Sequence, residues 1–193
     1  MAEAITLVIA YLLGSIPVSW LVFRWRTGQD LRQVGDGNVG AANAARMGAG
    51  HFFGAAIIVI DIGKGLLAVS VARWWGLELG WWMAAGGLVM VGHMWPIFLR
   101  FNGGRAAATG LGAAGAFLPW QFGVTFVVGG LTYLVTRIAE LGIILVAAPL
   151  PFLAIAFGEP IESIIFCFAA PIAAGLKTVF DKAWDRWQDA GTP

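Results

Sequence analysis

Charge is scarce along this chain. Asp, Glu, Lys and Arg make up 12% of the 193 residues, whereas about a quarter of an ordinary soluble domain is charged. Hydrophobic residues account for 59%, and the mean hydropathy is +0.80. The formal net charge of +1 indicates no nucleic-acid partner. Because no hydrophilic linker or low-complexity tail interrupts the sequence, it predicts a single integral membrane domain over residues 1–193.

Cysteine is almost missing as well. The single Cys167 lies in an apolar run and excludes an intrachain disulfide or a cysteine-based metal cluster, and we expect no metal and no cofactor. The amino-terminal segment lacks the basic residues of a cleaved signal peptide, since Glu3 and no Lys or Arg precede its apolar run. We therefore interpret residues 4–23 as the first membrane span.

Apolar segments are what the sequence has in abundance. A helix crosses a bilayer core of about 30 Å with roughly 20 apolar residues, or with fewer where it packs against other helices. Seven such segments are predicted, over residues 4–23, 51–72, 80–99, 106–118, 121–136, 141–157 and 161–176. Only Pro119 and Trp120 separate the fourth segment from the fifth, so one long broken helix is the competing interpretation.

The distribution of basic residues favours an all-α membrane protein with seven transmembrane helices. With the amino terminus outside and the carboxyl terminus cytoplasmic, Arg73 is the one basic loop residue on the outside. Ten basic residues then lie inside, as the positive-inside rule requires: Arg24, Arg26, Arg32, Arg46, Arg100, Arg105, Arg137, Lys177, Lys182 and Arg186. Merging the fourth and fifth segments would place the last four on the wrong side. The tail over residues 177–193 is expected to form a short amphipathic cytoplasmic helix.

Two opposite charges lie inside the second apolar segment. Asp61 and Lys64 are spaced i, i+3, which places them on one face of a helix. Either charge alone would cost about 2.5 kcal/mol or more in hydrocarbon, so the pair should face the interior of the helix bundle. Gly63 and Gly65 permit close approach of another backbone or of a ligand and favour a functional role. A structural ion pair that ties two helices together is the alternative.

A glycine-rich polar loop follows the first span. Its candidate anion-binding residues are Gly35, Gly37, Asn38, Asn43 and Arg46. The glycines allow successive backbone N–H groups to point into one concavity, and residues 41–47 are predicted to form a short helix whose amino terminus attracts phosphate. The loop lacks the GK[ST] of a Walker A motif and the β-strand of a dinucleotide fingerprint. A simple reversal of the chain between spans is the alternative.

A second polar loop lies within residues 92–109, G-H-M-W-P-I-F-L-R-F-N-G-G-R-A-A-A-T. Pro96 should bend or end the helix just after His93, and the glycine pair that follows frees the backbone. Arg105 is predicted to open a short helix whose amino end also favours anions. A histidine can act as a general base or a hydrogen-bond donor at neutral pH. A purely structural histidine is the alternative.

These motifs resemble the bacterial acyl-phosphate:glycerol-3-phosphate acyltransferases, which are small polytopic membrane enzymes. Four ordered blocks carry the resemblance over nearly the whole chain. They are G-S-x-P at residues 14–17, D-x-R-x-x-G-S-G-N-x-G-A-T-N-x-x-R at 30–46, D-x-x-K-G at 61–65, and G-H-x-x-P-x-F-x-x-F-x-G-G-K-G-V-A-T at 92–109.

The resemblance implies an enzyme of phospholipid synthesis in the bacterial plasma membrane, with its active site toward the cytoplasm. A fatty acyl phosphate would enter from the lipid side and glycerol 3-phosphate from the cytoplasm. The glycerol 1-hydroxyl would attack the acyl carbonyl, giving lysophosphatidic acid and inorganic phosphate. Positioning and electrostatics would supply most of the catalysis, and the phosphate itself can take the hydroxyl proton. We expect a monomer, surrounded by membrane lipids.

The resemblance also implies roles for individual residues. The predicted catalytic residues are His93, Asn38 and Lys64, with His93 donating to the acyl carbonyl or the glycerol hydroxyl. The predicted substrate-binding residues are Gly35, Asp36, Gly37, Asn43, Arg46, Asp61, Gly103, Gly104, Arg105, Thr109 and Arg137. One phosphate would lie at the first loop and the other near Lys64 and Arg105, and which loop holds which substrate is open.

Several positions depart from the family pattern. Asp36 replaces a serine, Ala42 a threonine, Arg105 a lysine, Ala106 a glycine, and Glu140 and Ile143 two serines. The family's H-R-x-N-I region is replaced by G-L-K-T-V-F-D-K-A-W. A carboxylate 4 Å from a phosphate costs about 4 kcal/mol at an effective dielectric near 20, unless Arg46 or Lys64 neutralises Asp36. The alternative function is therefore a catalytically impaired homologue that binds a lipid anion or serves in assembly.

Overall fold

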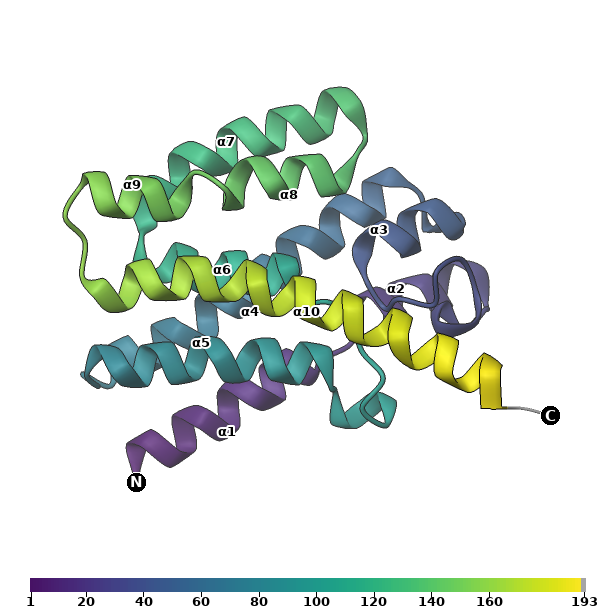
Figure 1. The fold of residues 1–193 in the computed structure, drawn as a ribbon, viewed down its shortest axis with the longest axis horizontal. Helices are drawn as coiled ribbons and strands as arrows, with labels where there is room; N and C mark the ends of the chain where they lie inside the picture. The colour runs from purple at the N-terminus through teal and green to yellow at the C-terminus, as the bar shows by residue number, and fades with distance from the viewer. Residues whose placement is uncertain (192–193) are drawn as a thin grey trace.

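The computed structural model describes residues 1–191, and within that range every regular element is helical. The long helices run roughly along the longest axis of the molecule (Figure 1). The α-helices are α1 (Ala2–Ser15), α2 (Val18–Thr27), α3 (Ala41–Ala44), α4 (His51–Trp74), α5 (Leu79–Met94), α6 (Ala107–Phe117), α7 (Pro119–Thr136), α8 (Ala139–Ala147), α9 (Leu150–Ala156) and α10 (Ile161–Gly191). The shorter elements are η1 (Leu31–Gln33), η2 (Ala45–Ala49) and η3 (Ile97–Leu99).

Five helical stretches among the described residues are long and apolar enough to cross a membrane. They are Ala2–Thr27, His51–Trp74, Leu79–Leu99, Ala139–Ala156 and Ile161–Trp184. Two further helices, α6 with 11 residues and α7 with 18, occupy the fourth and fifth predicted segments. They meet at Leu118, whose backbone is not helical (φ −125°, ψ 60°), so one continuous helix is not formed. The prediction of an all-helical chain with several helices of membrane-spanning length is confirmed.

Proline breaks two of the predicted spans. α1 and α2 are separated at Pro17, which has no N–H and holds the preceding Ile16 outside the helical region (φ −64°, ψ 112°). The sixth segment is likewise divided into α8 and α9 near Pro149. The predicted tail helix is not separate from the last span, because α10 continues unbroken as far as Gly191. Lys177 and Asp181 pair one turn apart just after the predicted boundary and support that continuation.

Glycines bring the central helices into close contact. A Cβ on Gly65 of α4 would collide with the carbonyl oxygen of Thr109 in α6, and one on Gly112 would collide with that of Ile62. α1 meets α5 in the same manner at Gly14. Small residues allow such packing between helices in lipid, where the hydrophobic effect gives no driving force. These contacts fix how α1, α4, α5 and α6 sit relative to one another.

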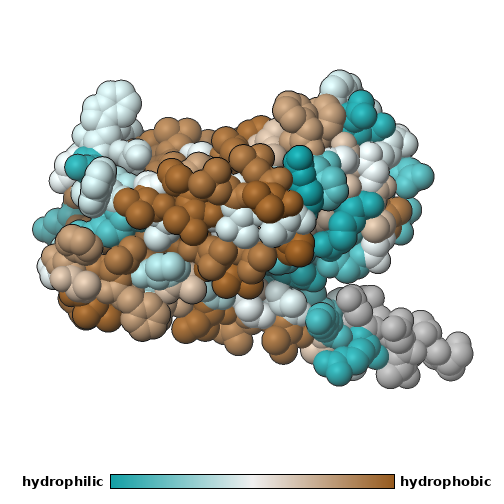
Figure 2. All heavy atoms as spheres, turned by 90° about the horizontal axis from the view of Figure 1, so that it is seen from above, coloured by the Kyte–Doolittle hydropathy of each residue, from teal (hydrophilic) through white to brown (hydrophobic). Residues whose placement is uncertain are grey.

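The surface separates apolar from polar residues along the molecule. Figure 2 shows hydrophobic residues over the middle and hydrophilic residues gathered mainly at the end that carries α2 and α3. Exposed apolar side chains such as Val59, Leu131 and Val135 belong to α4 and α7. Both polar loops, residues 28–50 and 95–106, lie toward the polar end, and the start of α1 and the end of α10 lie toward opposite ends (Figure 1).

Candidate functional site

Four polar side chains form a buried cluster between α4, α5 and α6. Nζ of Lys64 and Oδ1 of Asp61 are 2.9 Å apart, and both side chains are more than nine-tenths buried. Nδ1 of His93 lies 3.7 Å from the same carboxylate oxygen and 3.1 Å from Oγ1 of Thr109. The i, i+3 pair therefore faces the interior of the bundle, and a histidine and a threonine from the second polar stretch join it there.

Lys64 also reaches the break between α1 and α2. Its Nζ donates hydrogen bonds to the carbonyl oxygens of Gly14, at 3.1 Å, and Ile16, at 3.3 Å. The end of a helix leaves such carbonyls without intrahelical donors. Here a buried ammonium group donates to both, and the oxygen of Ile16 also accepts the N–H of Val18 at 3.0 Å. The pair therefore ties α4 to α1, which is the structural role considered for it.

The glycine pair of the second loop packs against His93. The backbone N–H of Gly103 donates to the carbonyl oxygen of Met94 at 3.2 Å, and that of Gly104 to the carbonyl oxygen of His93 at 3.1 Å. A Cβ on Gly104 would collide with Nε2 of the histidine ring. The loop can lie this close to the end of α5 only because both residues are glycines, and their N–H groups hold it there.

The short helices of the two loops differ from the predicted ones. α6 begins at Ala107 and not at Arg105, because Ala106 before it adopts a left-handed conformation (φ 59°). In the first loop, the helix predicted over 41–47 is the single turn α3 followed by the wider turn η2, which contains a non-helical Gly48 (φ 130°). The second loop therefore leads into a regular helix that begins two residues after Arg105, whereas the first loop leads into a single helical turn.

Asn43 organises the first loop. Its buried amide nitrogen donates to the carbonyl oxygens of Val34 and Asn38, each at 3.0 Å. Its Oδ1 accepts a longer hydrogen bond from the N–H of Asp36 at 3.4 Å. The two glycines on either side of Asp36 have positive φ (65° and 69°), and a Cβ on Gly35 would collide with Oδ1 of Asn43. The loop is held as one compact turn, and the donors of Asn43 are used within it.

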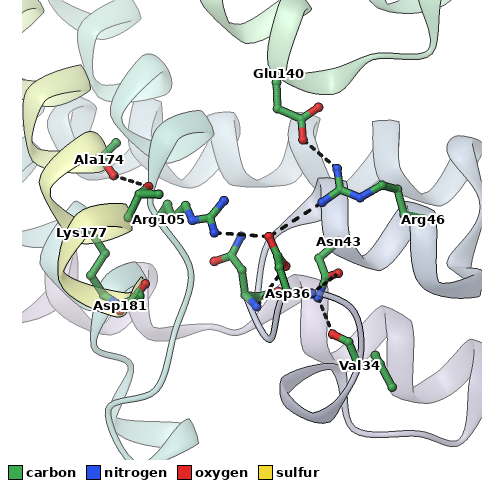
Figure 3. A network of polar contacts seen from close by, with 11 residues as sticks. Val34, Asp36, Asn43, Arg46, Arg105, Glu140, Ala174, Lys177 and Asp181 are labelled. Atoms are coloured by element: carbon green, nitrogen blue, oxygen red, sulfur yellow. Dashed lines mark hydrogen bonds and ion pairs between the residues drawn. The ribbon is translucent and has the colours of Figure 1, made fainter. Parts of the chain in front are cut away.

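Asp36 lies between two arginines that come from distant parts of the chain. Its Oδ2 is 3.2 Å from Nη2 of Arg105 and 3.8 Å from Nη2 of Arg46 (Figure 3). Its other oxygen, Oδ1, accepts a hydrogen bond from the N–H of Asn38 at 3.2 Å. Of the two partners expected to neutralise Asp36, Arg46 does so together with Arg105, whereas Lys64 is held in the buried cluster.

Glu140 extends this network to α8. Its Oε1 lies 2.7 Å from Nη1 of Arg46, which joins the first loop to the start of α8 (Figure 3). In the sequence, Glu140 stands out only as the replacement of a family serine. Because Asp36 also replaces a serine with a carboxylate, in a chain with few charges, the two changes together were a signal for a new ion pair. Arg137 ends α7 in a left-handed conformation (φ 60°) and is exposed. Of these two residues, Glu140 is the one that joins the network, through its ion pair with Arg46.

Lys177 and Asp181 form another ion pair, in α10. Nζ of Lys177 bonds to Oδ1 of Asp181 and lies 5.7 Å from the centre of the Trp95 ring (Figure 3 shows the ion pair). The Lys177 side chain is buried, although the sequence assigned it to a cytoplasmic tail. The i, i+4 spacing of opposite charges was the available signal. This contact brings the second half of α10 against the start of the second loop.

Two apolar grooves lie between the helices. One of about 220 Å³ is bounded by α4, α6, α7 and α8, and its lining includes Val59, Leu111, Gly130, Ile143 and Val146. Another of about 540 Å³ lies between α5 and α10. Across the part of the chain that the structure describes, no group of three or more His, Cys, Asp or Glu side chains could hold a metal ion.

Sequence comparison relates the chain to known proteins. A family model described as glycerol-3-phosphate acyltransferase matches residues 4–181. Glycerol-3-phosphate acyltransferase 2 of Moorella thermoacetica is 40% identical over 166 residues, which cover 86% of this chain and 84% of that protein. Glycerol-3-phosphate acyltransferase 4 of Dehalococcoides mccartyi is 49% identical over 109 residues, or 56% of this chain. That match spans only 47% of the relative's length.

Structural comparison gives a similar result. The chain is similar to PlsY, an integral membrane glycerol 3-phosphate acyltransferase solved in its glycerol 3-phosphate form, with a TM-score of 0.79 and 26% sequence identity. This similarity covers 98% of this chain and 94% of that one. The lysophosphatidic acid form of PlsY gives a TM-score of 0.74 at 25% identity, over 98% and 93% of the two chains. The shared fold therefore includes the helices and both polar loops.

Proposed function

This chain belongs to the glycerol-3-phosphate acyltransferase family, and we propose that it is an acyltransferase of phospholipid synthesis. In the proposed reaction, a fatty acyl group passes from acyl phosphate to the 1-hydroxyl of glycerol 3-phosphate, giving lysophosphatidic acid and inorganic phosphate. The observation that supports this most directly is the meeting of Arg46 and Arg105 at one end of the molecule. Two guanidinium groups from separate loops suit two phosphate-bearing substrates.

We propose that the chain crosses the membrane seven times. The five long apolar stretches, together with α6 and α7, account for that number. The start of α1 and the end of α10 lie toward opposite ends of the molecule, as an odd number of passes requires (Figure 1). An outside amino terminus and a cytoplasmic carboxyl terminus keep ten basic residues inside and Arg73 outside. The active site of this bacterial plasma-membrane enzyme then faces the cytoplasm, and the enzyme acts as a monomer.

In the proposed site, Arg46 and Arg105 bind the substrate phosphate groups jointly, because the two guanidinium groups lie close enough to contact one oxygen atom. Asn38 adds a donor at the same loop, while Asn43 and the glycines around Asp36 keep that loop in shape. Arg137, exposed at the end of α7, adds positive charge near the mouth of the site. Charge-assisted hydrogen bonds from fixed donors restrict the translation and rotation of the bound anions before they react. Less entropy is then lost in reaching the transition state, which is catalysis by positioning.

His93 donates a hydrogen bond to the acyl carbonyl in this mechanism. With the Thr109 hydroxyl donating to Nδ1, the ring proton is on Nε2, which faces the loop at Gly104. Asp61 and Lys64 act through the histidine and the end of α1, as positioning residues. The glycerol oxygen forms a bond to the acyl carbon, the bond from that carbon to the phosphate-bearing oxygen breaks, and the leaving phosphate takes the hydroxyl proton. A preorganised donor in a water-poor site stabilises the charge that develops on the carbonyl oxygen.

The groove bounded by α4, α6, α7 and α8 is proposed to hold the acyl chain. Its lining is almost entirely apolar, and it reaches Ala139, the neighbour of Glu140 in the charged network. An acyl chain in the groove would therefore bring its carboxyl end toward Arg46.

Phosphate release tests the proposal. Purified protein in detergent should release inorganic phosphate from palmitoyl phosphate only when glycerol 3-phosphate is added. Arg105→Ala should lower the rate strongly, because a phosphate loses its charge-assisted donors. If no phosphate is released from acyl phosphates of several chain lengths, the proposed reaction is wrong and the lipid-anion binder takes its place.

A further inference from the structure

The Asp36 carboxylate occupies the space between Arg46 and Arg105 that a substrate phosphate requires. One oxygen, Oδ2, contacts both guanidinium groups, at 3.8 and 3.2 Å. Glu140 contacts the far side of Arg46 at 2.7 Å. Two positive groups thus face two negative groups, and their charges cancel. A phosphate can contact both arginines only after the Asp36 carboxylate has moved away.

We propose that Asp36 is a specificity-determining residue, whose carboxylate competes with the substrate phosphate for Arg46 and Arg105. The competition weakens the binding of glycerol 3-phosphate and raises its KM. This inference rests on the proposed function, because it takes the two arginines as the phosphate-binding groups.

The charge of Asp36 can be removed without removing the hydrogen bond that Asp36 makes within the loop. Its Oδ1 accepts the N–H of Asn38, a local turn contact that any side-chain oxygen at this position can make. The rest of the loop is held by Asn43, whose contacts are mainly with backbone groups. Asp36→Asn and Asp36→Ser therefore keep an acceptor for the turn and remove only the charge. The side chain is 38% exposed, so its replacement leaves no buried cavity.

The two carboxylates are not equivalent. Asp36 forms ion pairs with both arginines, whereas Glu140 forms one with Arg46. Removing the charge of Asp36 frees both guanidinium groups at once. Removing the charge of Glu140 frees one face of Arg46 and leaves Asp36 in place. The proposal therefore requires a larger gain in phosphate affinity from Asp36→Asn than from Glu140→Gln.

Isothermal titration calorimetry on the full-length protein in detergent tests this. Glycerol 3-phosphate, inorganic phosphate and uncharged glycerol are titrated separately into the wild type and each variant. Asp36→Asn and Asp36→Ser should bind glycerol 3-phosphate and inorganic phosphate at least about tenfold more tightly, or about 1.4 kcal/mol. Affinity for glycerol should not change. Asp36→Glu, which keeps the charge, should bind phosphate as weakly as the wild type.

Glu78→Gln is the matched control. Glu78 is exposed in the turn between α4 and α5, at the opposite end of the molecule, so the variant removes one negative charge without touching the network. Its phosphate affinity should equal that of the wild type. An equal gain in Glu78→Gln and Asp36→Asn would overturn the proposal, because it would mean that net charge alone controls binding.

The outcomes distinguish this inference from the proposed reaction. Unchanged or weaker phosphate binding in both neutral Asp36 variants, with native melting curves, overturns the inference even if the wild type turns over. Tighter binding with no turnover in any variant supports the inference about the arginines and contradicts the acyl transfer. Where turnover is measurable, the neutral variants should lower the KM for glycerol 3-phosphate by about the same factor as Kd, with a smaller change in kcat.

Discussion

Nζ of Lys64 lies 3.1 Å from the carbonyl oxygen of Gly14, which is 50 residues earlier in the chain. The hydrogen bond joins α4 to the end of α1, where the break at Pro17 leaves carbonyl groups without helical donors. Asp61, 2.9 Å from the same nitrogen, compensates the charge. A buried ion pair thus also serves as a helix cap.

Lys64→Met should destabilise the protein by about 3 kcal/mol or more, because it leaves a buried carboxylate uncompensated. The carbonyl oxygen of Gly14 also loses its donor, and that of Ile16 keeps only the N–H of Val18. The midpoint of thermal unfolding in detergent measures the loss. The double variant Lys64→Met, Asp61→Leu should recover part of it, since no unpaired charge remains. A double variant no more stable than the single one would contradict this account.

Two glycines of α4 should respond differently to the same substitution. Gly65→Ala should destabilise the protein by about 1–3 kcal/mol, because its methyl group collides with the carbonyl oxygen of Thr109. Gly63→Ala is the control, since a Cβ there has open space and alanine favours the helix. Thermal unfolding of both variants should show a fall only for Gly65→Ala. Equal shifts would mean that close approach of α4 and α6 is not what requires Gly65.

Gly104→Ala should impair turnover, and thermal unfolding is measured beside the rate because the methyl group would also meet the backbone carbonyl oxygen of Val39. The added methyl group would push the His93 ring from its position, and a displacement of about 1 Å in an active site can cost about 100-fold in rate. Initial rates of phosphate release measure the change in kcat. Gly175→Ala on α10, where a Cβ meets open space, should retain the wild-type rate. A Gly104→Ala enzyme as fast as the wild type would remove His93 from the mechanism.

Filling the apolar groove should change the preferred acyl chain. Gly130 of α7 lines the groove, so Gly130→Phe should lower activity with palmitoyl phosphate more than with short-chain acyl phosphates. Gly123→Phe is the control, because it makes the same substitution on the same helix at a glycine that does not line the groove. The ratio of kcat/KM for long and short chains measures the effect. An unchanged ratio in Gly130→Phe would place the acyl chain elsewhere.

Asp30 should contribute to acid sensitivity. The hydrogen bonds from Arg32 hold the pKa of Asp30 well below its ordinary value of 3.8, with a further contribution from Trp20, whose Nε1 donates at 2.9 Å. Because the folded pKa is the lower one, the stabilisation is present above pH 3.8 and is lost as the pH falls toward the folded value. Asp30→Asn should therefore lower the unfolding midpoint at pH 7 and make it less dependent on pH below about 4. Parallel acid profiles for the two proteins would contradict this.

The helices and loops followed from local patterns in the sequence. Apolar runs long enough for a bilayer predicted the main helices, and the i, i+3 spacing of Asp61 and Lys64 predicted a shared, buried face. Pro17 was visible in the first apolar run, but a proline in a membrane helix either kinks or ends it. Which of the two occurs depends on donors elsewhere in the fold.

The pairing of charges across the site could not be predicted from such patterns. Asp36 and Arg105 are 69 residues apart, and Arg46 and Glu140 are 94 apart. Their contacts depend on how α6 and α8 pack on the first loop, which spacing along the chain does not encode. Considered separately, Asp36 and Glu140 looked like losses of hydroxyl groups. In the folded chain, Arg46 and Arg105 compensate the negative charges of both residues.

The break at Pro17 also has a consequence for biogenesis. The chain leaves the ribosome from its amino terminus, so the carbonyl group of Gly14 emerges well before Lys64, whose Nζ donates to it in the finished fold. Until then this carbonyl needs another donor, which water supplies and hydrocarbon does not. Burial of the end of α1 in hydrocarbon is therefore more favourable once α4 lies beside it.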